Sequence, residues 1–274
     1  MARLPCENDC KLTANSEVDA LVLAGGKGIR LKEGGIHETP KPLVNIRLQN
    51  GREIPMIENA IIGITSTLRC NLVLLTSQDP ESRSNMVEDY VRQKHSCGRF
   101  SFSIEDKPLG TAGAANNALI RRNTSIGIIT PCDTLFPFDQ LGKIIKTHKK
   151  KRSNITWVLT SNPGDGAQNT GKVFVDKLTG QIIYDFEAGG DQSSTNTHSL
   201  KPMTSVGVVI VDKDYYVAKF EEHFNHGSSG IVDLYRQYIP KLLETGERVD
   251  SFDIRQPAQD LGTVDRLNRF GKNN

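Results

Sequence analysis

The chain has no apolar run that approaches the length needed to cross a membrane, which is about 20 residues for a helix. It also has no excess of charge of one sign, because 34 Lys and Arg residues face 32 Asp and Glu residues and leave a formal net charge of +2. Proteins that bind nucleic acid through charge carry a basic surface. We therefore expect neither a membrane nor a nucleic acid as a partner. Residues 1–17 are polar without an apolar core, so we expect no secretory signal.

Cysteine is scarce, with five residues, an odd number, scattered through 274. A chain of this length buries enough surface to fold without crosslinks, and disulfide frameworks belong mainly to small secreted domains. We therefore expect reduced thiols and a cytoplasmic protein. Cys6 and Cys10 are spaced like half of a zinc site, but no second Cys or His pair lies at ligand spacing nearby.

Two common phosphate-binding motifs are missing as well. The P-loop does not occur, and the dinucleotide fingerprint fails at Leu31, where a glycine would stand three residues after Gly28. What is present is a short apolar strand, predicted at Leu21–Leu23, that ends in a glycine-rich loop. Glycine leaves backbone N–H groups open to a ligand, and Arg30 and Lys41 add two cations. Together these features predict a polyphosphate site.

This stretch resembles the signature of the sugar-phosphate nucleotidyltransferases, which runs roughly L-A-G-G-x-G-T-R-L and, after a loop, P-K-P-L. Ile29 replaces the usual Thr, and the spacing from Arg30 to Lys41 is one residue longer than usual. The resemblance is nearest to the mannose- and heptose-1-phosphate guanylyltransferases and extends from about Asp19 to Phe270. It implies contacts to the nucleotide from Leu23, Ala24, Gly25, Gly26 and Gly28.

A second family segment, E-x-x-P-L-G-T-A-G-A, is similar to residues 105–114. The resemblance implies that the nucleobase lies flat against the glycine, where a Cβ would take the place of the base. Close packing of a helix on a sheet would also require small residues, and the two explanations are compatible. The form of the segment favours guanylyl transfer. Nucleotide contacts are expected from Pro108, Gly110 and Thr111.

A third stretch places Asp133 after the buried strand expected at Ile126–Thr130. The family commonly has G-D there, and its Asp binds a divalent metal with a second Asp in a D-I-G-T-like segment before the last helix. Asp260-Leu261-Gly262-Thr263 is similar to that segment. An isolated Asp before Thr or Gly is more often a cap or a turn residue. In the expected order, however, Asp133 and Asp260 predict a Mg²⁺ site.

The resemblance also implies the reaction. A sugar 1-phosphate attacks the α-phosphorus of a nucleoside triphosphate in line, pyrophosphate leaves, and no general base is needed. Arg30 is expected to hold the β- and γ-phosphates, and Lys41 the α-phosphate or the incoming phosphate. The expected partners are thus a nucleoside triphosphate, a sugar or cyclitol 1-phosphate and Mg²⁺. Many relatives form dimers or larger oligomers, so a homo-oligomer stays open.

Contacts to the sugar phosphate follow the family pattern less closely. The family segment E-K-P, whose Lys contacts the sugar phosphate, reads Glu187-Ala188-Gly189 here, so that Lys is missing. Where many relatives have N-A-G, this chain has Ser205-Val206-Gly207. Lys172, beside a glycine that resembles a sugar-contacting one, is a candidate substitute. We therefore expect an unusual sugar or cyclitol, with contacts from Gly171, Lys172, Glu187 and Gly207.

Two other functions stay open. A catalytically silent regulatory subunit of the same fold would agree with the missing Lys and disagree with the retained charged residues. A nucleotide-sugar-dependent glycosyltransferase of related fold would need a D-x-D metal motif, which Cys132-Asp133-Thr134 does not supply. Release of pyrophosphate separates these functions, because only the nucleotidyltransferase produces it.

Strands separated by helices organise the first half of the chain. Apolar runs predict strands at Leu21–Leu23, Asn71–Thr76, Ser101–Glu105 and Ile126–Thr130. Helices are expected from Pro55 and over Pro80–His95, Thr111–Arg121 and Pro137–Lys149. The alternation implies parallel pairing with right-handed crossovers, and hence an α/β fold with a Rossmann-like layered, mainly parallel sheet.

The pattern changes after residue 155. Strands with little helix between them are expected at Ile155–Thr160, Lys172–Asp176, Ile182–Glu187 and Thr204–Val211. A helix at Ile231–Glu244, a strand near Val249–Phe252 and a last helix from Val264 follow. We expect an inserted mixed-sheet sugar-binding lobe. Without a repeat or a linker, residues 1–274 should form a single domain, with a nucleotide-binding half at about 18–150 and a sugar-phosphate half at about 151–274.

Overall fold

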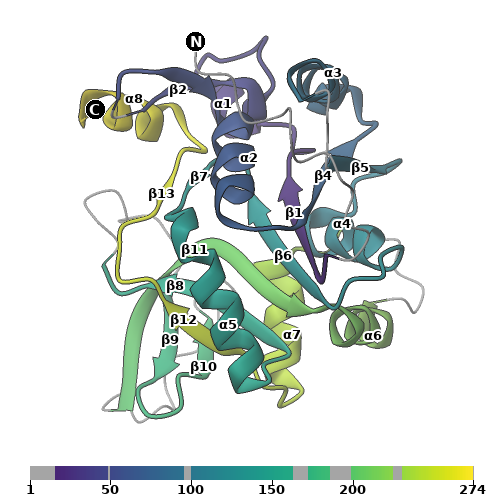
Figure 1. Cartoon of the computed structure of the whole chain (residues 1–274), viewed down its shortest axis with the longest axis vertical. Helices are drawn as coiled ribbons and strands as arrows, with labels where there is room; N and C mark the ends of the chain where they lie inside the picture. Colours follow the sequence, from purple (N-terminus) through teal and green to yellow (C-terminus); the bar gives the residue numbers. More distant parts are fainter. Residues whose placement is uncertain are drawn as a thin grey trace.

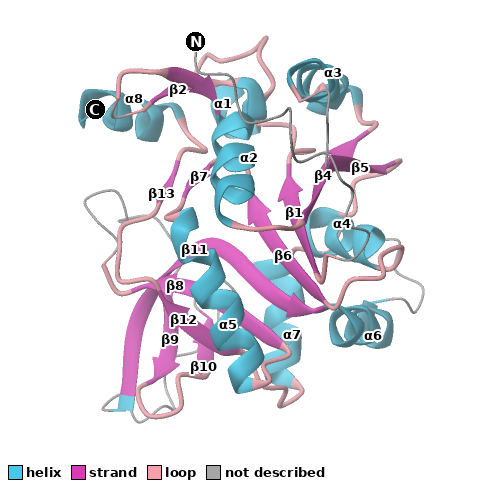
Figure 2. Cartoon of the chain, in the orientation of Figure 1, coloured by secondary structure: helices cyan, strands magenta, loops and turns pink. Residues whose placement is uncertain are grey.

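The structure is a computed structural model that describes residues 16–48, 50–95, 100–162, 172–185, 199–224 and 230–273. Most of its strands form one large sheet with helices on both faces (Figure 1 and Figure 2). Four neighbouring strands run parallel, in the order β6 (Ile126–Pro131), β1 (Val18–Leu23), β4 (Asn71–Ser77) and β5 (Phe100–Glu105). The predicted Rossmann-like, mainly parallel sheet is therefore confirmed.

Alternating residues of the parallel strands face two separate cores. In β1, Ala20 and Val22 belong to one core, whereas Leu21 belongs to the other. The helices of the first core are α2 (Met56–Thr67), α3 (Ser84–Lys94) and α5 (Leu141–Lys151). Those of the second are α4 (Gly110–Leu119), α6 (Lys213–Phe224) and α7 (Ile239–Glu244). Because both faces are covered, β1, β4 and β6 are apolar along most of their length, whereas the edge strand β5 alternates Phe and Ser.

The second half of the chain extends the same sheet with antiparallel pairs. The long strand β11 (Leu200–Asp212) pairs antiparallel with β6, with β8 (Ile155–Thr160) and with β9 (Lys172–Asp176). β12 (Asp250–Asp253) then joins β8, and β10 (Ile182–Asp185) joins β9. The expected mixed-sheet lobe is thus continuous with the parallel strands through β11.

A third, smaller core joins segments that are far apart in the sequence. It packs α8 (Val264–Asn273) against α1 (Ile29–Glu33) and against the hairpin of β2 (Asn45–Arg47) and β3 (Glu53–Pro55). Figure 1 shows α8 beside β2. Its buried residues are Leu31, Val44, Ile46, Ile54, Met56 and Leu261. This core fixes the C-terminal helix against the helix that carries Arg30.

The other predicted elements are confirmed with shifted ends, except that three helices differ in detail and that the last two residues of the strand expected at Ile182–Glu187 lie outside the described residues. The helix expected over Pro137–Lys149 begins with a 3₁₀ turn (Phe138–Gln140) before α5. The helix expected over Pro80–His95 is broken at Arg83, whose φ is 51°, into a 3₁₀ turn (Pro80–Ser82) and α3. The helix expected at Ile231–Glu244 begins with a π-helical turn (Leu234–Tyr238) that leads into α7. The sequence patterns do not predict α6 or the β2–β3 hairpin.

Within the described ranges, no helix is long and apolar enough to span a membrane. Cys70 and Cys132 are buried free thiols, whereas Cys6, Cys10 and Cys97 lie outside the described residues. The cytoplasmic location, the homo-oligomer and the division into two halves stay predictions.

Candidate active site

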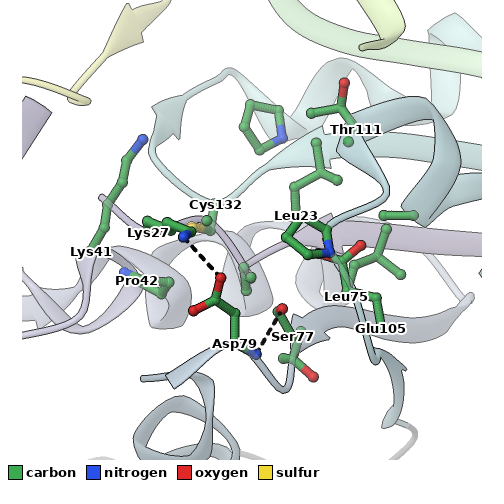
Figure 3. Close-up of a pocket in the computed structure, with 18 of the residues that line it drawn as sticks. Leu23, Lys27, Lys41, Pro42, Leu75, Ser77, Asp79, Glu105, Thr111 and Cys132 are labelled. Carbon is green, nitrogen blue, oxygen red and sulfur yellow. Dashed lines mark hydrogen bonds and ion pairs between the residues drawn. The ribbon is translucent and has the colours of Figure 1, made fainter. Parts of the chain in front are cut away.

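Two adjoining cavities open at the carboxyl ends of β1, β4 and β6, where ligands bind in open parallel sheets. Figure 3 shows the first of them. The first has a volume of about 400 Å³, and the second, along the glycine-rich loop, about 520 Å³. Both are lined by Gly26, Lys27, Arg30 and Lys41. The residues predicted to contact the nucleotide all line one cavity or the other: Leu23, Ala24, Gly25, Gly26, Pro108, Gly110 and Thr111 the first, and Gly26 and Gly28 the second.

The glycine-rich loop needs two of its glycines for local reasons. A Cβ on Gly25 would lie 3.0 Å from the carbonyl carbon of Thr76 in β4. Gly28 has a φ of 66°, in the left-handed region, and precedes the first turn of α1. Gly26 differs, because nothing lies within 4 Å of the position of its Cβ and it lines both cavities. Its backbone is therefore open to a ligand.

Lys41 and Asp133 form an ion pair at the centre of the site. Lys41 opens the 3₁₀ turn Lys41–Leu43, Asp133 follows β6, and their side chains are 19% and 9% exposed. Burial alone would raise the pKa of Asp133, but the charge of Lys41 and its hydrogen bond outweigh burial and hold that pKa below its ordinary value. Burial opposes the charge of Lys41 too, and the Asp133 carboxylate nevertheless raises the pKa of Lys41. Both groups are therefore charged at neutral pH.

Asp260 reaches the same place through a short antiparallel pairing. β13 (Gln259–Asp260) pairs with β7 (Thr134–Leu135), and the Leu261 amide donates to the Asp133 carbonyl at 2.9 Å. A Cβ on Gly262 would lie 2.7 Å from Asp260 Oδ1 and 2.9 Å from both Arg30 Nη2 and Asp133 Oδ2. The structure thus brings together Arg30, Lys41, Asp133 and Asp260, the four residues predicted for catalysis and metal binding.

Arg266 is a charged neighbour that the sequence analysis misses. Its guanidinium on α8 contacts Asp260 Oδ2, while Asp260 Oδ1 accepts a hydrogen bond from the Gly262 amide at 2.6 Å. Both oxygens of this carboxylate are therefore held in place. The only signal in the sequence is a cation in the helix that follows the D-L-G-T segment.

Gly110 has a local reason to lack a side chain. It has a φ of 74°, and a Cβ there would lie 2.5 Å from the carbonyl oxygen of Val232. Packing against the backbone of Val232 therefore excludes a side chain, and the contact with a nucleobase stays a prediction. Thr111 likewise has a local role, because its hydroxyl accepts from the Leu234 amide at 2.7 Å and donates to Asp233 at 3.2 Å. Both residues still line the first cavity.

The far wall of the first cavity carries polar residues that were not predicted as site residues: Ser77, Asp79 and Glu105 (Figure 3). Glu105 accepts a hydrogen bond from the Leu109 amide at 3.1 Å, and burial raises the pKa of its carboxyl group. Ser77 ends β4, Asp79 follows it, and Glu105 ends β5. Their place at strand ends is the signal that could have identified them.

The predicted sugar-phosphate residues are only partly described. Gly171 and Glu187 lie outside the described residues, as does the side chain of Lys172 in β9. Gly207 lies in a β-bulge of β11 with a φ of 74°, and its carbonyl accepts from Tyr235 Oη at 2.6 Å. Tyr235 itself lines the first cavity, so Gly207 contacts a residue of the cavity wall but does not line the cavity.

The fold and this site define an α/β protein with a glycine-rich loop and paired charged residues at the carboxyl edge of its sheet. The model of the nucleotidyl transferase family matches residues 19–269. The chain belongs to that family.

Two curated relatives are similar over about half of this chain. The mannose-1-phosphate guanyltransferase 2 of Candida glabrata is 30% identical over 135 residues, which cover 48% of this chain and 35% of that protein. The D-glycero-α-D-manno-heptose 1-phosphate guanylyltransferase of Aneurinibacillus thermoaerophilus is 28% identical over 142 residues, which cover 52% and 57%. The chain therefore spans less than two thirds of the length of these relatives.

Solved structures share the fold over nearly the whole chain. HddC from Yersinia pseudotuberculosis, complexed with GMP-PN, has a TM-score of 0.67 at 19% identity, over 93% of this chain and 98% of that one. The inositol-1-phosphate CTP transferase from T. maritima has a TM-score of 0.64 at 17% identity, over 93% and 95%. At these identities the likeness shows the fold alone.

Proposed function

We propose that the chain transfers a nucleotidyl group from a nucleoside triphosphate to the 1-phosphate of a sugar or cyclitol and releases pyrophosphate, with GTP as the nucleotide. The observation that carries the proposal is the convergence of Arg30, Asp133 and Asp260 on Gly262, next to Lys41. Two anions react in this chemistry, so the site must supply fixed positive charge against their repulsion.

The reaction joins an oxygen of the sugar 1-phosphate to the α-phosphorus, and the bond from that phosphorus to the pyrophosphate oxygen breaks in line. The attacking phosphate is ionised at neutral pH, so no side chain has to accept a proton. Arg30 holds the leaving β- and γ-phosphates. Lys41 neutralises the α-phosphate or the incoming phosphate, and the open backbone at Gly26 lets the triphosphate approach.

Asp133 and Asp260 would hold Mg²⁺, and their chemistry fits this ion. Both offer oxygen ligands, and Asp133 is kept ionised by Lys41. In the part of the chain that the structure describes, no group of three or more His, Cys, Asp or Glu side chains could hold a metal. Mg²⁺ commonly takes one or two carboxylates and completes its shell with water and substrate phosphates. When bound, the ion neutralises charge on the phosphate oxygens.

The choice of GTP rests on the wall of the first cavity and on the relatives. Guanine presents an N–H and an amino group as donors, and the carboxylates of Asp79 and Glu105 are matching acceptors that line this cavity. The two curated relatives compared above are named guanyltransferases.

A pyrophosphate-release screen tests the proposal. Five nucleoside triphosphates are combined with a panel of sugar and cyclitol 1-phosphates and Mg²⁺, and release that requires both substrates supports it. Triphosphate binding without release across the panel would favour the silent regulatory subunit instead. Release that does not depend on the 1-phosphate would show hydrolysis and contradict the proposal.

A further inference from the structure

Lys27 lies where the two cavities meet, in the variable position of the glycine-rich loop. It lines both cavities together with Gly26, Arg30 and Lys41, and its side chain is 37% exposed. Figure 3 shows the ammonium of Lys27 directed across the cavity toward Asp79. A triphosphate whose base occupies the first cavity and whose phosphates extend into the second would pass this side chain.

The partners of Lys27 lie in the segment that follows β4. Its Nζ is 3.0 Å from Asp79 Oδ2 and 3.0 Å from Glu81 Oε2. Asp79 is fixed independently, because its Oδ1 accepts from the Glu81 amide at 2.9 Å and its own amide donates to Ser77 Oγ at 3.2 Å. Lys27 is therefore more flexible than Asp79, its partner in this ion pair.

The contact with Glu81 is of a kind that breaks easily. Ion pairs between exposed groups contribute little to stability, and the side chains of Lys27 and Glu81 are 37% and 67% exposed. Asp79, at 18% exposed, is the more buried partner. Two other contacts hold the segment with Asp79 and Glu81 to α1 and to the loop after α1. Lys32 Nζ in α1 donates to the Glu81 carbonyl at 2.9 Å, and Arg83 donates to the Glu38 carbonyl. Lys27 can therefore leave its partners without detaching this segment. Lys41, in contrast, is buried against Asp133.

We propose that Lys27 is a phosphate-binding arm that pairs with Asp79 and Glu81 when no polyphosphate is bound and transfers to the β- and γ-phosphates of a bound triphosphate. Phosphate oxygens carry more charge than a carboxylate and form strong charge-assisted hydrogen bonds with an ammonium. The arm thus favours triphosphates over monophosphates. This inference rests on the proposed function, because it assumes that a nucleotide occupies the cavities.

Binding measured by calorimetry without a 1-phosphate acceptor tests the arm apart from turnover. The probes are the triphosphate that binds best among GTP, ATP, CTP, UTP and dTTP, and its own monophosphate. Lys27→Met should weaken triphosphate binding about tenfold or more, the loss of one charge-assisted hydrogen bond, and leave monophosphate binding within about twofold. Lys146→Met, which removes an exposed cation on α5 that lines neither cavity, is the matched control and should leave both affinities unchanged.

Glu81→Gln provides a second test of the proposal. The substitution removes one carboxylate that competes with the phosphates for Lys27. Triphosphate binding should therefore tighten about twofold to threefold in the wild-type background and stay unchanged when the chain also carries Lys27→Met. Unchanged triphosphate affinity in Lys27→Met, or an equal loss for both nucleotides, would overturn the phosphate-binding arm while the proposed function stands. A wild-type chain that binds none of the five triphosphates would overturn both.

Discussion

Lys41 donates to Asp133 in an ion pair that joins the loop after α1 to the carboxyl end of β6. Each residue keeps the other charged despite burial, as the lowered pKa of Asp133 and the raised pKa of Lys41 indicate. The fold thus places two charges that the proposed reaction needs before any substrate binds. They are a carboxylate for Mg²⁺ and a cation for phosphate.

Asp133→Asn should lower the rate of pyrophosphate release by more than about 100-fold, the scale on which one electrostatic group acts in an active site. The fold should persist, because Lys41 lines both cavities and can be solvated from them. Steady-state kinetics and circular dichroism measure the two effects. Asp139→Asn, at an exposed position after β7, is the control and should be fully active. An Asp133→Asn variant with wild-type turnover would remove this residue from the mechanism.

Gly34→Ala should displace the C-terminal helix, because a Cβ on Gly34 would lie 2.3 Å from Val264 Cγ2. Overpacking of this kind costs about 1–3 kcal/mol of the free energy of unfolding. Since Asp260 and Gly262 precede α8, pyrophosphate release should fall as well. Adding Val264→Ala removes the nearest methyl group and should restore part of both losses.

Gly142→Ala in α5 is the control for that substitution, since nothing lies within 4 Å of the position of its Cβ. It should leave turnover unchanged and stabilise the helix by up to about 1 kcal/mol. Chemical denaturation and kinetics of the wild type and the three variants make the comparison. Wild-type stability in Gly34→Ala would show that α8 does not need this close approach.

Glu105→Gln should lower kcat/KM for GTP about tenfold and change the values for the other triphosphates less, because a carboxylamide offers guanine one acceptor fewer. The measurement is kcat/KM for all five triphosphates with one acceptor. An equal loss with every triphosphate would assign Glu105 a structural role instead, through its hydrogen bond with the Leu109 amide.

His148 should make the chain less stable in mild acid. Its imidazole is buried, with Nδ1 2.8 Å from Thr156 Oγ1, and burial lowers its pKa to about 4. A depressed pKa contributes stability that is complete above the unfolded value of about 6.5 and is lost as pH falls toward about 4. The loss from this residue between pH 7 and pH 5 should be about 2 kcal/mol.

The measurement for His148 is the free energy of unfolding by urea at both pH values. Carboxylates also titrate in this range, so His148→Gln serves as the reference, and the wild type should lose about 2 kcal/mol more than this variant. Equal losses in the two proteins would show that His148 is protonated as readily in the folded chain as in the unfolded one.

Local patterns predicted most strands of the large sheet, and β1, β4 and β6 are apolar over most of their length. The glycine-rich loop drew attention to Arg30 and Lys41, whereas Asp133 and Asp260 were identified through the resemblance to the family. Their convergence on Gly262 depends on the pairing of β13 with β7, two strands of two residues each, which no sequence pattern predicts.

Contacts that arise from tertiary packing were missed for the same reason. Arg266 contacts Asp260 only because α8 packs on α1. The break at Arg83 needs a left-handed backbone at a residue that usually avoids it, so periodicity alone predicts a continuous helix. For Gly110, close packing was expected, but the atoms that it packs against, the backbone of Val232, could not be identified from the sequence.

The most direct test of the proposed transfer follows both ends of the triphosphate in one reaction. GTP labelled at either the α- or the γ-phosphate is incubated with Mg²⁺ and the 1-phosphate that gives the highest rate in the screen. We predict that the α-label appears in a nucleotide-sugar or nucleotide-cyclitol product and the γ-label in pyrophosphate, in equal amounts. A γ-label recovered as orthophosphate, or an α-label that never joins the acceptor, would contradict nucleotidyl transfer.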